Sequence, residues 1–94
     1  MANASASSEP LKETIHGHPI VSQRRSPGGN GTRHGRVILV DRGPRDSGRW
    51  VTAWQGKEIK EGKDVWDKEW LWGHYYSDEK IARDDYHERC LRGY

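Results

Sequence analysis

The chain has 94 residues, of which 32% are hydrophobic and 32% charged, with a net charge of +2 and no phenylalanine. This length allows one domain at most, and the low hydrophobic fraction indicates that part of the chain is unfolded. No apolar run approaches the roughly 20 residues that a membrane-spanning helix needs, so no association with a membrane is expected.

A disordered, mildly basic tail or linker is predicted for residues 1–34. The opening "MANASASSEP" has nothing to bury, and residues 18–24 allow a short strand around a brief apolar run. Residues 26–35, "SPGGNGTRHG", contain four glycines and are expected to be flexible because glycine loses the most backbone freedom on ordering. The start lacks the basic and hydrophobic regions of a secretory signal, and the single Cys90 suits a reducing compartment. A cytoplasmic location is therefore expected.

Residues 35–94 are predicted to form a small α+β domain, in which a three-stranded antiparallel sheet precedes one C-terminal amphipathic helix (β-β-β-α). The predicted strands cover residues 36–42, 49–55 and 69–76. The first two are joined by "GPRDSG", whose residues favour turns, so they are expected to form a hairpin. Residues 56–64, "GKEIKEGKD", are predicted to be a polar connection.

The helix is expected over residues 78–91. Ser77 is the predicted N-cap, and Tyr76 and Ile81 stand where a hydrophobic staple forms. The apolar stripe that should face the sheet is Ala82, Tyr86 and Cys90. Gly93 is suited to end the helix.

All five tryptophans fall between residues 50 and 72. Strict strand alternation would place Trp50, Trp54, Trp70 and Trp72 on one sheet face. Because a small domain needs side chains that bury a large area, these four are predicted to lie beneath the helix. Trp66 is expected to begin the last strand or to lie in the loop before it.

The opposite sheet face is predicted to be the functional surface. Its members are Val51, Ala53, Gln55, Leu71 and Tyr75, and no second helix is available to cover them. Residues 18–21, a second copy of the chain or a protein partner could each cover such a face. The sequence therefore favours a non-enzymatic interaction module that binds a protein partner or self-associates through this face or an edge strand.

The alternative is single-stranded nucleic-acid binding, since aromatic residues on a sheet with basic neighbours can stack on bases. Its candidate contacts are the arginines of the glycine-rich arm and of the first hairpin: Arg24, Arg25, Arg33, Arg36, Arg42, Arg45 and Arg49. Against this alternative, acidic and basic residues are equal in number over residues 35–94, which leaves no basic stripe.

No metal, cofactor or catalytic centre is predicted. Asp84, His87 and Cys90 are spaced for chelation on a helix, but a structural zinc site needs about four ligands and no further ligand is near in sequence. Cys90 lies on the predicted buried stripe, as a core cysteine would. His74 with Asp67 or Asp78 could form an acid–base pair, but no cleft-forming loops accompany it. The protein is therefore not expected to be an enzyme.

Overall fold

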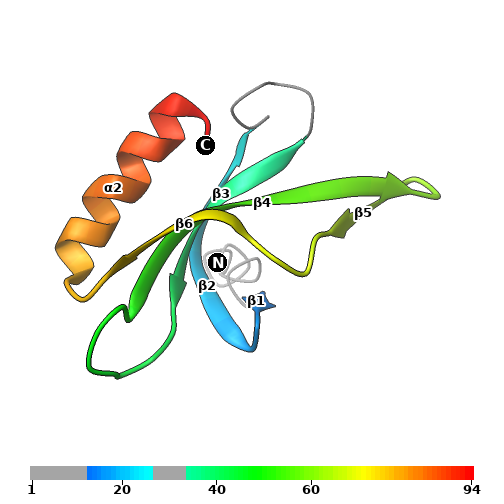
Figure 1. The fold of residues 1–94 in the computed structure, drawn as a ribbon. Coiled ribbons are helices and arrows are strands. Elements are labelled where there is room, and N and C mark those ends of the chain that lie inside the picture. The colour runs from blue at the N-terminus through cyan, green and yellow to red at the C-terminus, as the bar shows by residue number, and fades with distance from the viewer. Residues whose placement is uncertain (1–12, 27–33) are drawn as a thin grey trace, which may run out of the picture.

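The computed structural model describes residues 13–26 and 34–94. Most of the predicted glycine-rich linker and the first twelve residues lie outside this part of the chain. The described residues form six strands and one helix: β1 (Thr14–Ile15), β2 (His18–Ser26), β3 (Gly35–Asp41), β4 (Trp50–Lys60), β5 (Lys63–Trp66), β6 (Leu71–Tyr76) and α2 (Glu79–Arg92). The α+β class with a C-terminal helix is confirmed, but the sheet is larger than the three strands predicted (Figure 1).

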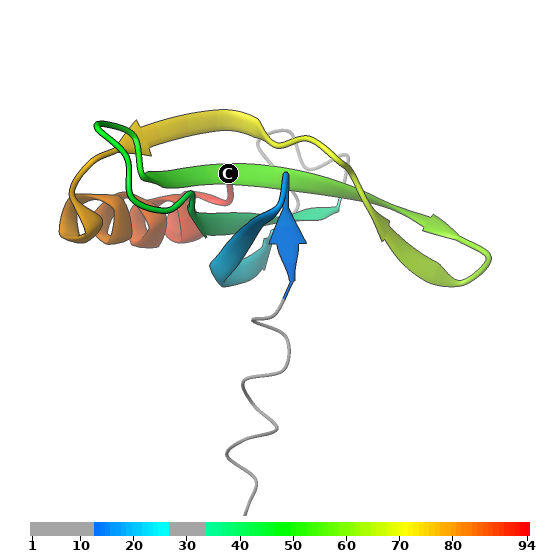
Figure 2. The ribbon, with the colours of Figure 1, turned by 90° about the horizontal axis from the view of Figure 1, so that it is seen from below.

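The sheet is antiparallel, with the order β1-β2-β3-β4-β5 and with β6 pairing β4. The predicted hairpin of β3 and β4 is present, in a register from Gly35↔Gly56 to Asp41↔Trp50. Besides pairing with β3, β4 is long enough to pair with two further strands, β6 near its start and β5 near its end. Figure 2 shows that the β4–β5 hairpin extends well beyond the helix.

Three strands lie outside the three that were predicted: β1, β5 and β2, for which the sequence allowed only a short strand over residues 18–24. β2 pairs with β3 from Ser26↔Gly35 to Ile20↔Val40, so a domain boundary at residue 35 would cut through the sheet. β4 continues to Lys60, which pairs with Lys63, so the polar connection predicted for residues 56–64 is wrong. The two residues between them, Glu61 and Gly62, both have positive φ, as a tight type I′ hairpin turn requires.

The helix covers one face of the sheet. Ala82 and Tyr86 of α2 pack on a buried cluster that includes Val37, Trp50 and Trp54, so the prediction is confirmed for these two tryptophans. Asp78, rather than Ser77, is the N-cap, and its Oδ1 accepts a hydrogen bond from the Ile81 amide at 3.1 Å. The helix ends as predicted at Gly93, which has a left-handed φ of 100°.

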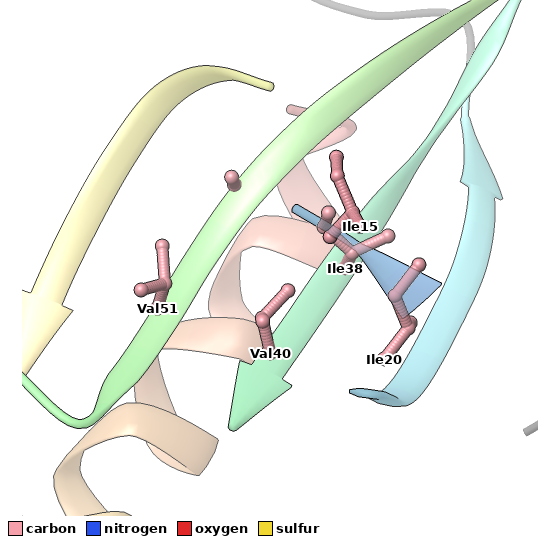
Figure 3. Packing of buried hydrophobic residues seen from close by; sticks show 6 residues of the cluster. Ile15, Ile20, Ile38, Val40 and Val51 are labelled. Atoms are coloured by element: carbon pink, nitrogen blue, oxygen red, sulfur yellow. The ribbon is translucent and has the colours of Figure 1, made fainter. Parts of the chain in front are cut away.

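The other face is covered by the β1–β2 hairpin. Ile15 and Ile20 of this hairpin pack with Ile38, Val40, Val51 and Ala53 on the side of the sheet away from α2 (Figure 3). Trp70 packs against this second cluster, so the prediction that it lies beneath the helix is wrong.

A bulge in β6 explains this error. Leu71 pairs with Trp54 and His74 pairs with Thr52, so Trp72 and Gly73 together lie opposite one residue of β4. The extra residue reverses the alternation of side chains along the strand. Trp70 therefore points to the face opposite the one that strict alternation predicts.

Candidate functional site

The predicted interaction face is mostly covered. Val51, Ala53 and Gln55 are buried, and the cover includes Ile20 from the segment at residues 18–21. The expectation that this face is open is therefore wrong for these three residues. The remaining two members, Leu71 and Tyr75, are exposed and lie on β6.

β6 presents an apolar edge. Leu71 is 42% exposed, and Trp72 and Tyr75 are each 51% exposed. Directly paired residues share a sheet face, so Leu71, which pairs with Trp54, points to the helix side, whereas Tyr75, which pairs with Val51, points to the other side. Among the described strands β6 pairs only with β4. The exposed side chains therefore flank the free edge of the sheet on both sides.

Trp72 has an unusual backbone. Its φ is 56°, a left-handed conformation that is a genuine outlier for a bulky residue. Strain of this kind persists only where the surroundings enforce it, and it is concentrated at functional sites. The Trp72 ring lies 5.5 Å from the ring of buried Trp54 and 5.8 Å from the ring of Tyr94. It is thus supported on one side while half of its surface faces solvent.

Tyr75 is held by its neighbours on the other side of the edge. Trp70 Nε1 donates to the Tyr75 hydroxyl at 3.2 Å, and the Arg42 guanidinium lies 5.0 Å from the Tyr75 ring centre. Aromatic side chains that are fixed in the unbound state lose little entropy on binding.

A polar cluster joins β6 to the helix. Asp85 Oδ2 accepts from the Thr52 hydroxyl at 2.5 Å and lies 3.1 Å from His74 Nδ1. Burial tends to raise the pKa of Asp85, but the hydrogen bonds from Thr52 and His74 outweigh it and hold this pKa below its usual value. His74 therefore pairs with Asp85, not with the Asp67 or Asp78 expected from the sequence.

Arg89 forms the buried side of this cluster. Its Nη1 donates to the Thr52 carbonyl at 3.0 Å and to the Thr52 hydroxyl at 3.1 Å, and burial lowers its pKa. A carboxylate that orients an imidazole can support proton transfer in a suitable site. Here the His74–Asp85 pair joins the helix to β6 and so fixes the strand that carries the exposed edge.

The candidate nucleic-acid arginines do not form one surface. Arg24 and Arg25 lie on β2 and Arg36 is buried at the start of β3, whereas the remaining described ones flank the turn after β3: Arg42, Arg45 and Arg49. At about 3.4 Å per residue, the length of β3 separates the two groups by roughly 20 Å. Arg49 is also neutralised by two hydrogen bonds to Asp41, at 2.8 and 3.0 Å. Arg33 lies outside the described residues.

A hollow lies beside Trp66, which the sequence placed only at a strand start or in a loop. The hollow has a volume of about 390 Å³ and is lined by Glu13, Gln23, Arg25, Arg36 and Trp66. The Arg36 guanidinium lies 3.9 Å from the Trp66 ring centre. No sequence signal identifies this hollow, because its residues come from β2, β3, β5 and the residue before β1.

Within residues 13–26 and 34–94, no group of three or more His, Cys, Asp or Glu side chains is placed to hold a metal ion. Asp84 instead bonds Lys80, and Cys90 is a free thiol packed at the edge of the helix-side cluster. No helix in this part of the chain is long and apolar enough to cross a membrane.

No protein-family model matches the sequence, and neither a curated protein nor a solved structure matches it significantly.

Proposed function

We propose that this protein is a small non-enzymatic interaction module that binds another polypeptide along the free edge of β6. The observation that carries the proposal is the exposure of Leu71, Trp72 and Tyr75 on a strand whose backbone pairs with β4 alone among the described strands. An edge of this kind can accept a further strand, and its backbone groups then supply affinity while its side chains supply specificity.

The composition of the edge fits a protein partner. Natural proteins protect free edges with charged residues or proline, whereas β6, "LWGHYY", contains neither proline nor lysine, arginine or a carboxylate. Tryptophan and tyrosine are also the residues that most often dominate binding energy at protein interfaces. The bulge at Trp72 shortens the regular part of the edge, so the aromatic side chains must contribute much of the affinity.

A second copy of the chain is the first partner to test. Most soluble oligomers are symmetric, and two β6 edges can lie antiparallel without bringing like charges of the strand together. Sedimentation velocity over a range of micromolar concentrations should show reversible dimerisation. Leu71→Glu and Tyr75→Glu should each weaken it at least tenfold by burying an unpaired charge at the interface.

The matched control is Leu91→Glu, the same substitution at an exposed position of α2. It should leave dimerisation unchanged, and all three variants should keep the wild-type circular dichroism spectrum. If Leu91→Glu weakened association as much as Leu71→Glu, the β6 edge would not be the binding surface. A chain that remained monomeric throughout would exclude self-association and leave only a different polypeptide as the partner.

The alternative function, binding of single-stranded nucleic acid along all the candidate arginines, has less support. The separation of the arginines into two groups removes the continuous basic path that a nucleic-acid backbone would follow.

A further inference from the structure

The side-chain pattern of β6 restricts how a second copy of the chain can join its free edge. Tyr76 packs against the helix-side cluster and His74 contacts Asp85 of α2, so both point to the side that carries the helix. Leu71 points to this side as well, whereas Tyr75 points to the other. A second strand must match these directions.

Symmetry limits the match to one kind of register. When two antiparallel strands of one sheet are related by a two-fold axis, the axis is perpendicular to the sheet, so both helices lie on the same face. Directly paired residues share a face, and neighbours along a strand point to opposite faces. A register that paired a residue with the next residue of the second copy would therefore place side chains on the wrong faces. The axis must pass between a residue and its own counterpart.

His74 is the residue that lets the whole of β6 pair. With the axis at His74, Tyr75 lies opposite Gly73 of the second copy, on the face away from the helix. The bulge takes up the extra residue, so Tyr76 lies opposite Leu71 of the second copy, and both are on the helix side. An axis at Tyr75 would instead leave the first half of the strand unpaired.

The distribution of charge favours a second copy in this orientation. β6 carries no lysine, arginine or carboxylate, and the imidazole of His74 has the Asp85 carboxylate of its own chain 3.1 Å from Nδ1. The two helices run antiparallel over the joined sheet. The acidic first turn of one helix, with Glu79, and the basic last turn of the other, with Arg92, are therefore at the same end of the sheet. This arrangement is electrostatically complementary.

We infer that two copies of the chain join through β6 with the two-fold axis at His74, an inference that rests on the proposed role of the β6 edge. Trp70 Nε1 donates to the Tyr75 hydroxyl within each copy, and a Cβ added at Gly73 would lie 2.9 Å from the same nitrogen. The Trp70 ring thus lies over the glycine that faces Tyr75 of the second copy. Rings from both copies meet on the face away from the helices.

Disulfide cross-linking of the full chain locates the axis. Cys90 is the single cysteine, so in a Cys90→Ala background the introduced thiol is alone. His74→Cys places two Cα atoms about 4.5–5.5 Å apart, the separation of opposite residues in an antiparallel pair. A disulfide spans about 4.4–6.8 Å between Cα atoms, so a covalent dimer should form in a glutathione redox buffer.

Leu71→Cys is the matched control, because Leu71 is exposed on the same face of the same strand. Its two copies would be more than about 15 Å apart, beyond the reach of a disulfide. Tyr75→Cys tests the neighbouring register, since its copies would be diagonal neighbours about 7–8 Å apart. His74→Cys should cross-link at least about tenfold faster than either, because thiols held in a complex have a higher effective concentration than thiols that meet by collision.

A second experiment leaves His74 in place and so keeps its contact with Asp85. Leu71 lies opposite Tyr76 of the second copy in this register. A mixture of the Leu71→Cys and Tyr76→Cys chains should therefore form a mixed covalent dimer that neither chain forms alone. Circular dichroism verifies that each variant is folded.

The inference would be overturned if Tyr75→Cys or Leu71→Cys cross-linked as fast as His74→Cys, or if neither His74→Cys nor the mixture gave a covalent dimer. If the wild-type chain still dimerised and Leu71→Glu still weakened dimerisation, the β6 edge would remain the interface and only the axis would be wrong. A wild-type chain that stayed monomeric would overturn self-association and this inference together.

Discussion

The cover formed by the β1–β2 hairpin makes Ile15 a sensitive probe of the fold. Ile15 is buried against Ile38, Val40 and Val51, although it belongs to a strand of only two residues. Ile15→Ala removes three buried carbon groups at about 0.8 kcal/mol each, and the cavity left behind adds to this loss. We expect the free energy of unfolding to fall by about 2–4 kcal/mol.

Urea denaturation followed by tryptophan fluorescence measures this change. The matched control is Ile59→Ala in the projecting β4–β5 hairpin, where the side chain is 63% exposed. It should alter stability by no more than about 0.5 kcal/mol. If Ile15→Ala lowered the free energy of unfolding as little as Ile59→Ala, β1 would not be packed on the sheet. Val51, Ala53 and Gln55 would then form an exposed face, as the sequence predicted.

Trp54→Ala should cost about 3–5 kcal/mol, because its ring is buried beneath the helix. Trp72→Ala should cost clearly less, and equal losses in urea denaturation would contradict the assignment of Trp54 to the core and Trp72 to the surface. Acid should destabilise the protein partly through Asp85. Its pKa is lowered in the folded state, so its contribution is present above about pH 4, the value of an unfolded aspartate, and is lost as the pH falls through the folded-state pKa. Asp85→Asn should therefore flatten the dependence of stability on pH below about 5, and an unchanged slope would show that the Thr52 and His74 hydrogen bonds do not favour the carboxylate.

Elements with a strong local signal were predictable from the sequence. The helix has capping residues at both ends and an apolar stripe, and its bounds differ from the prediction by one residue at each end. The β3–β4 hairpin combines a β-branched run with turn residues, and Trp50 and Trp54 lie beneath the helix as alternation predicts.

The errors arose where tertiary structure overrode local pattern. β2 and β5 are rich in polar side chains, so they lack the apolar alternation that identifies a strand, and β5 lies at the edge of the sheet. The bulge at Trp72 has no clear sequence signature, apart from Gly73, and it reversed the predicted side of Trp70. Burial of Val51 depends on Ile15, which is distant in sequence and stands in a stretch that was predicted to be a tail.

The candidate surface was predicted only in part for the same reason. Leu71 and Tyr75 were identified because they lie on an apolar strand, and they are exposed. The Trp66 hollow was missed because its lining is brought together by strand pairing between residues far apart in the chain.

Amide hydrogen exchange of β6 at low and high protein concentration tests the central claim most directly. If a second copy adds its strand to this edge, the amides of residues 71–76 that point away from β4 should become more protected as the concentration rises. The amides of the β4–β5 turn at Glu61 and Gly62 should exchange at the same rate at both concentrations. Protection of β6 that did not change with concentration, in a chain whose sedimentation showed association, would contradict binding through the β6 edge.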